Sequence, residues 1–265
     1  MISILIVHYN RPDLLEVCLG SLGDAEDVIV VDNGSLQEMD AQRLKTSFPG
    51  VTWSFLDNNV GFSAGVNHAA RLAQGDNFFL LNPDTRWGGT CFKDLEAFFT
   101  QHEADIVGLK QFTSSGDTQL SVGWEPKVLQ EGFRKALQDG LNRNAYTARQ
   151  LLSLCQKEGG AAWVAGSALL TSRALFESLK GFDERYFLYF EDIDYCLRAR
   201  QLGATVAYSK AFSLIHHGGA CAETTRGVAE QHYRDSQILF FSEHGSLFAR
   251  HILPWWAQIR KWIKA

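Results

Sequence analysis

Residues 2–35 read ISILIVHYNRPDLLEVCLGSLGDAEDVIVVDNGS, and this stretch determines the predicted fold. Ile2 to Val7 is a continuous apolar, β-branched run typical of a buried strand. Pro12 then opens a segment whose leucines recur at helical spacing, and Val28 to Val31 is a second buried run. The stretch therefore predicts a βαβ unit, in which a helix connects two strands of one sheet.

The same alternation continues beyond this unit. Val51 to Leu56 is a third predicted strand, Ser63 is expected to cap the next helix, and Phe78 to Leu81 is a fourth apolar run. Buried runs that alternate with helices predict an α/β fold, with a mostly parallel, Rossmann-like sheet covered by helices on both faces. Ligands bind such sheets at the carboxyl ends of the strands.

Each of the four predicted strands ends in a polar cluster. Asn, Asp, Gly and Pro are also ordinary turn formers, so turn chemistry alone explains any single cluster. Four clusters at successive strand ends favour one shared ligand-binding crevice. The clusters are His8-Tyr9-Asn10-Arg11, Asp32-Asn33-Gly34-Ser35, Asp57-Asn58-Asn59-Val60-Gly61 and Asn82-Pro83-Asp84.

Composition excludes several classes of protein. The 265 residues carry a formal net charge of -5, so no cationic field attracts nucleic acid, and no nucleic-acid partner is predicted. The five cysteines lie far apart without a C-x-x-C pair, which indicates a reducing compartment rather than a disulfide framework. No run approaches the roughly 18 consecutive apolar residues of a membrane span, so a cytoplasmic protein is expected.

The second half of the chain has a different sequence pattern. Residues 113–160 begin with a polar, glycine-containing stretch and continue with two amphipathic patterns, which predicts a helical insertion over the sheet. Ala161 to Leu170 returns to a strand-like run, and residues 204–208 and 212–215 predict further short strands. From Val228 onward the pattern is helical.

The residues that could carry chemistry are carboxylates and histidines. Neither G-x-G-x-x-G after the first strand nor G-x-x-x-x-G-K-[ST] occurs, which argues against a dehydrogenase and a P-loop enzyme. Asp84 ends the fourth strand, an acidic group surrounds Asp192, and His216 and His217 follow an apolar run. A carboxylate and an imidazole together suit Mg²⁺ or Mn²⁺ beside a phosphorylated ligand.

Seven segments, taken in order, resemble glycosyltransferase family 2, most closely its rhamnosyltransferase-like branch. The resemblance spans about residues 2–245. It implies a GT-A domain over 1–245, with a nucleotide-binding half at 1–110, the insertion at 113–160 and an acceptor and catalytic half at 161–245. The segments are Val7-His8-Tyr9-Asn10-Arg11, Val31-Asp32-Asn33-Gly34-Ser35, Asn59-Val60-Gly61-Phe62, Leu81-Asn82-Pro83-Asp84, Gly181-Phe182-Asp183-Glu184, Phe190-Glu191-Asp192-Ile193-Asp194 and His216-His217-Gly218-Gly219.

The resemblance implies an inverting transferase that uses Mg²⁺ or Mn²⁺ and moves a sugar from a nucleoside diphosphate donor, a dTDP- or UDP-sugar, to a glycan or lipid-linked hydroxyl. Its branch suggests rhamnose from dTDP-rhamnose and the assembly of cell-surface polysaccharides such as lipopolysaccharide. Asn82 departs from the family's acidic pair. The site residues implied are Tyr9, Asn10, Asp32, Gly61 and Asn82 for the donor, Asp84 and His216 for the metal, and Asp192 as catalytic base.

Elementary chemistry agrees with these roles but leaves alternatives open. A cation at Asp84 and His216 would offset the charge that grows on a diphosphate leaving group. A helix starting at Glu191 would place Asp192 in its first turn, where the dipole favours the ionised form that a base requires. Without the resemblance, Asp192 would be an ordinary acidic residue at a helix start. Trp163 either stacks on a sugar or fills the core, and residues 186–190 favour core over a sugar platform.

Residues 246–265 form a predicted amphipathic helix rich in tryptophan and basic residues. Such a helix either lies in an anionic membrane interface or packs on the domain or on a second subunit of a homodimer. The first alternative would place the protein peripherally on the inner face of the cytoplasmic membrane.

Two other functions stay open at this stage. A sugar nucleotidyltransferase should carry a glycine-rich basic loop after the first strand, where this chain has His8-Tyr9-Asn10-Arg11. A non-catalytic family member that binds nucleotide or glycan would fit the loss of one acid at Asn82, although Asp84, Asp192 and His216 argue against it.

Overall fold

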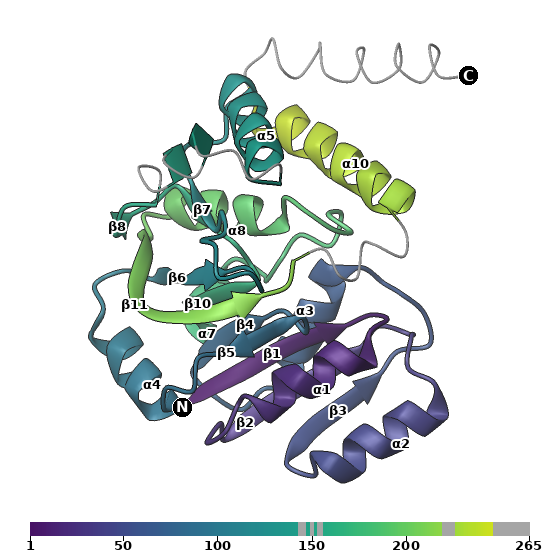
Figure 1. Cartoon of the computed structure of the whole chain (residues 1–265). Helices are drawn as coiled ribbons and strands as arrows, with labels where there is room; N and C mark the ends of the chain where they lie inside the picture. Colours follow the sequence, from purple (N-terminus) through teal and green to yellow (C-terminus); the bar gives the residue numbers. More distant parts are fainter. Residues whose placement is uncertain (143–146, 149–150, 153–155, 219–225, 246–265) are drawn as a thin grey trace.

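The computed structural model describes residues 1–142, 147–148, 151–152, 156–218 and 226–245 (Figure 1). Its strands in chain order are β1 (Ile2–His8), β2 (Asp27–Asp32), β3 (Val51–Phe55), β4 (Asn77–Leu81), β5 (Thr85–Trp87), β6 (Ile106–Phe112), β7 (Val122–Gly123), β8 (Gly159–Gly160), β9 (Trp163–Val164), β10 (Ala168–Ser172) and β11 (Val206–His216). Its helices are α1 (Pro12–Gly20), α2 (Glu38–Ser47), α3 (Phe62–Leu72), α4 (Phe92–Gln101), α5 (Val128–Asn142), α7 (Arg173–Ser178), α8 (Glu191–Gln201) and α10 (Arg226–His244).

One large sheet organises the described residues. Its strands follow the order β3-β2-β1-β4-β10-β6-β11-β5, with β8 beside β11, while β7 and β9 form a separate pair. The strands from β3 to β4 are parallel, as are β6 and β11, and β10 runs antiparallel between β4 and β6. The prediction of an α/β fold with a mostly parallel central sheet is confirmed.

Helices cover both faces of this sheet, which explains why β1 is apolar without interruption. Ile4 and Ile6 point into a core shared with α1, α2 and α4. Leu5 and Val7 point into a second core shared with α3, α7, α8 and α10. Since successive side chains of a strand alternate between faces, a strand buried on both sides has no polar face to show.

Three local expectations differ from the structure. The run from Ala161 to Leu170 is divided into β9 and β10, because a turn intervenes in which the Ala168 N–H donates to the Ala165 carbonyl at 3.2 Å. The two short strands expected near the end are one strand, β11, whose register shifts between Ser209 and Ser213. Ser63 lies inside α3 rather than at its cap, and its hydroxyl donates to the Tyr186 carbonyl.

The insertion is tied to the main sheet rather than hinged beside it. Within 113–160, β7 pairs with β9, β8 pairs with β11, and α5 lies beside α10 at the top of the view in Figure 1. The second predicted helix is described only at residues 147–148 and 151–152, which are helical. The predicted helix at 246–265 lies outside the described residues. None of the helices in the described ranges has the length and apolar character that crossing a bilayer requires.

An internal ion pair anchors α8. Arg198 Nε lies 2.6 Å from an oxygen of Asp194, which is 1% exposed, and the same guanidinium donates to the carbonyls of Leu179 and Gly181. His244 Nε2, at the end of α10, lies 2.8 Å from the other Asp194 oxygen. The Asp194–Arg198 pair therefore joins α8 to the end of α10 and to the segment after α7.

Replacing Arg198 with Met should destabilise the protein by about 3 kcal/mol, because it removes one partner of a buried ion pair and leaves the Asp194 carboxylate undercompensated. Urea denaturation followed by far-ultraviolet circular dichroism measures this change. Arg43→Met is the matched control, since Arg43 pairs with Glu16 on the surface and its loss should change stability by less than about 1 kcal/mol. Equal effects of the two substitutions would contradict an anchoring role for Arg198.

Candidate active site

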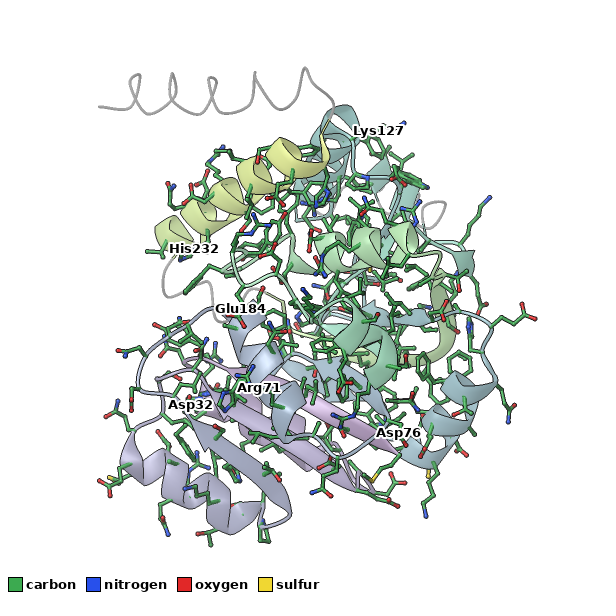
Figure 2. The ribbon with its side chains drawn as sticks, turned by 180° about the vertical axis from the view of Figure 1, so that it is seen from behind. Asp32, Arg71, Asp76, Lys127, Glu184 and His232 are labelled. Atoms are coloured by element: carbon green, nitrogen blue, oxygen red, sulfur yellow. The ribbon has the colours of Figure 1, made fainter. Side chains whose placement is uncertain are left out.

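A cavity of about 460 Å³ opens at the carboxyl ends of β1, β2 and β4. Its remaining walls come from α3, the end of β11, the loop before α8 and the first turns of α10. Figure 2 labels Asp32, which ends β2, and His232 on α10. The lining residues are Val7, Tyr9, Asn33, Asn59, Phe62, Asn82, Pro83, Asp84, Phe187, Leu188, Tyr189, His216, Val228, Ala229 and His232.

Asp84 and His216 meet at the floor of this cavity. His216 Nε2 lies 3.2 Å from Asp84 Oδ1 and 3.4 Å from the side-chain nitrogen of Asn82. Burial raises the pKa of Asp84, but the hydrogen bond and the charge of His216 outweigh it, so the pKa lies below its usual range. His217 is exposed, and its backbone N–H donates to the Asp84 carbonyl, so His216 is the histidine that faces the site.

The donor set of Asp84 and His216 fits a divalent cation of the Mg²⁺ or Mn²⁺ type. A carboxylate oxygen and an imidazole nitrogen, both at the cavity, are accepted ligands for Mn²⁺, and Asn82 adds a neutral carbonyl oxygen nearby. Within the described ranges no cluster of three or more His, Cys, Asp or Glu side chains is arranged to hold a metal. Oxygens of a bound diphosphate and water would therefore have to complete the coordination.

Asp32 lies beneath the cavity rather than in its wall. One of its oxygens accepts hydrogen bonds from His8 Nδ1 and the Ser35 hydroxyl, both at 2.8 Å, and the other accepts from the Ser35 and Leu36 N–H groups at 3.0 Å. Burial raises the pKa of Asp32, but these bonds, led by the one from His8, outweigh it and lower the pKa. All four acceptor positions of the carboxylate are thus occupied from within the protein.

The Asp32 network also fixes the loop after β1. The Ser35 hydroxyl accepts the backbone N–H of Asn10 at 2.9 Å. Asn10 and Arg11 both have positive φ, 51° and 106°, a conformation that non-glycine residues rarely adopt. The network therefore holds a strained turn whose first residue, Tyr9, lines the cavity. Asn10 and Asp32 support the loops around the cavity, and neither lines it.

Gly61 is required by a close approach of two loops. Its φ is +89°, and an added Cβ would lie 2.7 Å from the Phe187 carbonyl oxygen, which is closer than real contacts allow. That carbonyl accepts the N–H of Phe62 at 2.7 Å. Asn33 completes the arrangement by donating to Asn59 and to the Gly61 carbonyl. Gly61 lets the aromatic loop before α8 close one side of the cavity.

Asp192 lies in the first turn of α8, as predicted. One of its oxygens accepts the Gly166 N–H at 2.9 Å and the other accepts its neighbour's N–H, from Ile193, at 2.8 Å. An added Cβ on Gly166 would lie 3.4 Å from Asp192 Cβ and 3.8 Å from Phe62, which lines the cavity. The expectation that the helix start favours the ionised form is not met, because burial raises the pKa of Asp192, although the two backbone hydrogen bonds oppose the rise.

The turn immediately before α8, which positions Asp192, is strained. Tyr189 and Phe190, immediately before α8, have φ values of 69° and 67°. Phe190 is 2% exposed and contacts three rings of α10, those of Tyr233, Phe240 and Phe241. Left-handed backbone at bulky residues persists where the surroundings impose it. Here the aromatic packing against α10 imposes it.

Several residues at the site were not predicted from the sequence. Residues 186–190 were expected to be core, and Tyr186 and Phe190 are, but the three residues between them line the cavity. His232 stacks on Phe187 with ring centroids 4.3 Å apart, a contact between segments with no sequence signal in common. Trp163 is 6% exposed, which supports the core alternative for its ring.

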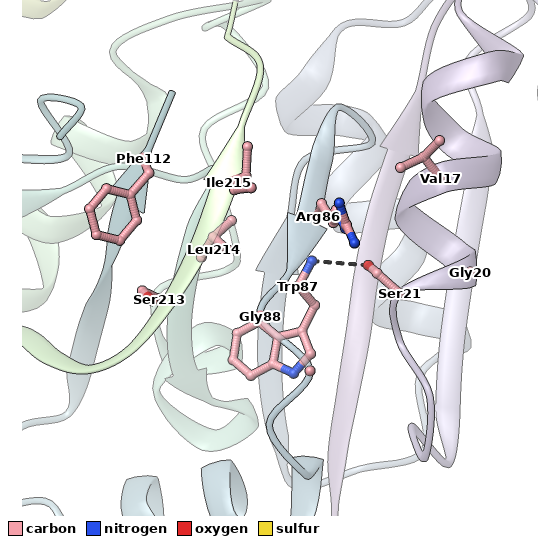
Figure 3. A pocket seen from close by; sticks show the side chains of 11 residues that line it. Val17, Gly20, Ser21, Arg86, Trp87, Gly88, Phe112, Ser213, Leu214 and Ile215 are labelled. Carbon is pink, nitrogen blue, oxygen red and sulfur yellow. Dashed lines mark hydrogen bonds between the residues drawn. The ribbon is translucent and has the colours of Figure 1, made fainter. Parts of the chain in front are cut away.

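A second cavity, of about 690 Å³, lies between β5, β11 and α1 (Figure 3). The Trp87 N–H donates to the Ser21 hydroxyl across it at 2.9 Å. Among the described residues that line it, Arg86 alone is charged, and none is a carboxylate or an imidazole. The smaller cavity holds the acid, the histidine and the convergent loops, so it is the candidate active site.

Comparison with known proteins agrees with this geometry. The sequence pattern of Glycosyl transferase family 2 matches residues 3–154, more than half of the chain. The chain belongs to glycosyl transferase family 2. It is 27% identical over 282 residues to the N-acetylglucosaminyl-diphospho-decaprenol L-rhamnosyltransferase of Mycobacterium tuberculosis (strain CDC 1551 / Oshkosh), covering 99% of this chain and 88% of the relative. It is 24% identical over 224 residues to the Rhamnosyltransferase WbbL of Escherichia coli (strain K12), covering 82% and 83%.

Solved structures support the fold. The crystal structure of GalNAc-T7 with UDP, GalNAc and Mn²⁺ superimposes with a TM-score of 0.61 at 12% identity, over 92% of this chain and 50% of that one. At this identity the likeness concerns the fold alone. The family 2 transferase thus has a GT-A type fold, and the family resemblance seen in the sequence is confirmed.

Glu191, beside Asp192, gives a test of the electrostatics of the site. It is 6% exposed, one of its carboxylate oxygens has no hydrogen-bond partner among the described residues, and burial followed by the charges of Asp192 and Asp194 raises its pKa well above 4.5. The folded state therefore binds a proton that the unfolded state releases. Stability that depends on this group is lost as the pH rises from the ordinary value toward the raised one.

The substitution Glu191→Gln should remove this loss, so the variant should gain about 1 to 3 kcal/mol over the wild type at neutral pH, the range typical of an unsatisfied buried polar group. The gain should shrink toward zero as the pH falls below the ordinary glutamate value. Urea denaturation at a series of pH values measures it. Glu103→Gln, at an exposed position, is the control, and a gain for Glu191→Gln that does not change with pH would contradict the raised pKa.

Proposed function

We propose that this family 2 glycosyltransferase is an inverting, metal-dependent enzyme that moves a sugar from a nucleoside diphosphate donor to an acceptor hydroxyl. The observation that supports the proposal is the convergence of Asp84 and His216 on one cavity. Asp192 does not line this cavity, but it is bonded to Gly166, which lies beside the lining residue Phe62. A leaving diphosphate needs positive charge, and an attacking hydroxyl needs a base, so the two groups serve the two ends of one displacement.

The donor end of the cavity suits a nucleotide. Tyr9 provides an aromatic surface, and Asn33 and Asn82 provide amide groups along the strand ends. Asp84 and His216 would hold Mg²⁺ or Mn²⁺, and Asn82 would offer a carbonyl oxygen or contact a phosphate. When bound, such an ion offsets the negative charge of the departing nucleoside diphosphate. Asn10, Asp32 and Gly61 act on the donor through the loops they fix.

Asp192 is the proposed catalytic base. Its carboxylate is oriented by two backbone N–H groups and lies at the start of α8, so its position is set by the fold rather than by a flexible side chain. Because burial raises its pKa, it binds a proton more readily than an exposed aspartate does. A base with these properties can accept the proton of an acceptor hydroxyl as the hydroxyl attacks the anomeric carbon.

The relatives suggest which sugar and acceptor are involved. The mycobacterial relative is described as transferring L-rhamnose to an N-acetylglucosaminyl-diphospho-decaprenol, and the E. coli relative as a rhamnosyltransferase. We therefore propose rhamnose, from dTDP-rhamnose, as the donor sugar and a lipid-linked glycan of cell-surface polysaccharide assembly as the acceptor. The membrane contact or subunit contact predicted for residues 246–265 would serve such an acceptor and stays a prediction.

A family member that binds nucleotide without turnover is the second candidate. Asn82 favours it, because an amide replaces one carboxylate of the family's acidic pair and lies 3.4 Å from His216. The ordered placement of Asp192 favours the enzyme. Binding and turnover can be measured separately, so two experiments distinguish the candidates.

The first experiment is calorimetric titration with dTDP, UDP and GDP, each with and without Mn²⁺. One nucleotide should bind with metal-dependent affinity, and Asp84→Ala should weaken that binding at least about tenfold, because a ligand charge is lost. Asp94→Ala, on α4, is the matched control and should bind as the wild type does. Failure of all three nucleotides to bind would contradict the proposed donor site.

The second experiment measures transfer by Asp192→Asn. Its turnover should fall by about 10² to 10⁴, the range typical of a lost general base, while nucleotide affinity stays unchanged. For the wild type, the rate should fall as the pH drops through the raised pKa of Asp192, because only the ionised carboxylate accepts a proton. Retained turnover in Asp192→Asn would exclude Asp192 as the base, and a wild type that binds donor without any transfer would favour the binding protein.

A further inference from the structure

A buried polar chain lies behind the candidate metal ligand. The oxygen Oε1 of Gln111, on β6, lies 2.9 Å from His216 Nδ1 and accepts the Ser167 hydroxyl at the same distance. Gln111 is 1% exposed and Ser167 is 8% exposed. The Ser167 carbonyl also accepts the N–H of Asn82 at 3.2 Å. These hydrogen bonds therefore connect Gln111 and Ser167 to His216 and to Asn82, the two residues beside Asp84.

The chemistry of these contacts determines where the proton of a neutral His216 lies. An amide oxygen only accepts hydrogen bonds, so a contact from Gln111 Oε1 requires the proton on Nδ1. At the other side of the ring, the amide nitrogen of Asn82 faces Nε2 at 3.4 Å, and an amide nitrogen only donates. Both of these neighbours favour the tautomer with a lone pair on Nε2, whereas the Asp84 carboxylate, which only accepts, favours a proton on Nε2. The contact with Gln111 is the shorter of the two opposing contacts, 2.9 Å against 3.2 Å, so we expect it to decide the tautomer of the neutral ring.

This tautomer changes the meaning of the short distance between His216 and Asp84. With a lone pair on Nε2, two electron-rich atoms face one another at 3.2 Å, an arrangement that a cation between or beside them would stabilise. With the proton on Nε2, the same distance would be an ordinary hydrogen bond, and the imidazole could not bind a metal through that atom.

We propose that Gln111 is a positioning residue, which fixes the tautomer and the ring orientation of His216 so that Nε2 is available to a divalent cation. The inference rests on the proposed metal site. Metal-binding histidines commonly donate their second ring N–H to an oxygen of the protein, and loss of that oxygen typically lowers metal affinity 10- to 100-fold. The role assigned to this side chain belongs to its oxygen, because Oε1 makes the contacts with both His216 and Ser167.

The test compares two substitutions of similar size. Gln111→Met removes the acceptor, and Gln111→Glu retains an acceptor oxygen. Gln42→Met, at an exposed position on α2, is the matched control. The protein is labelled with ¹⁵N-histidine and studied without metal, at a pH raised until the ¹⁵N shifts of His216 are those of a neutral ring. The His216 signals are assigned by their loss in His216→Ala, and the ¹⁵N shifts report which ring nitrogen carries the proton.

The wild type, Gln111→Glu and Gln42→Met should show His216 protonated on Nδ1, and Gln111→Met should show the proton on Nε2 or divided between the two nitrogens. Proton on Nε2 in the wild type, or the same tautomer in Gln111→Met as in the wild type, would overturn the proposal. This readout needs neither donor nor transfer, so it stands apart from any failure of the proposed function.

Titration with Mn²⁺, followed by the loss of the free-ion electron paramagnetic resonance signal, is the second readout. Gln111→Met should bind Mn²⁺ 10- to 100-fold more weakly than the wild type, and Gln111→Glu should restore binding. Equal affinity in Gln111→Met and the wild type would overturn the proposal. If the Gln111→Met protein unfolds at a lower temperature, Gln111→Glu distinguishes a general loss of stability from a loss of the acceptor. An acceptor role predicts that Gln111→Glu retains both the tautomer and the Mn²⁺ affinity of the wild type.

Discussion

The approach of Asp84 to His216 is the contact on which the arrangement of the active site depends. Asp84 follows β4 and His216 ends β11, so the two side chains come from strands separated in the sheet by β10 and β6. The short strand β5 closes the distance, because it starts directly after Asp84 and pairs antiparallel with the end of β11. Without that pairing the acid and the histidine would belong to different parts of the sheet edge.

The residues that line the cavity and the proposed base Asp192 are positioned by different contacts. Tyr9, Asn33 and Asn82 extend from strand ends, whose positions are fixed by the backbone hydrogen bonds of the sheet. Asp192 instead depends on a helix that is held by side-chain contacts to its neighbours. A mutation in the sheet interior should thus displace the residues that line the cavity, whereas a mutation around α8 should displace mainly Asp192.

Sequence patterns predicted the elements better than the contacts between them. The apolar runs of β1, β2 and β4 were recognised because burial on both faces leaves a continuous signal. The break between β9 and β10 was missed, because Ala165 and Gly166 are small and apolar and do not interrupt such a run, although the Gly166 N–H orients Asp192. Gln111 was missed for a related reason, because a single polar residue in a strand forms no repeating pattern that could be recognised.

The role that the family resemblance gives to Asp32 stays a prediction, and the structure adds the contacts of its side chain. The family resemblance assigned it to the nucleoside pocket, and its place at the end of β2 agrees with that assignment. The structure shows its four acceptor positions filled by His8, Ser35 and Leu36. A sequence motif records that a residue type is present, and it does not record whether the side chain is already engaged.

The strained turn at Tyr189 and Phe190 has a consequence for the order in which the protein matures. The turn is imposed by rings on α10. This helix follows β11 in the chain and is the last of the described helices. During synthesis, β1, β2 and β4 leave the ribosome long before those rings do. In a nascent chain these strands are therefore made well before the contacts that orient Asp192, which are complete only when the last described helix has docked.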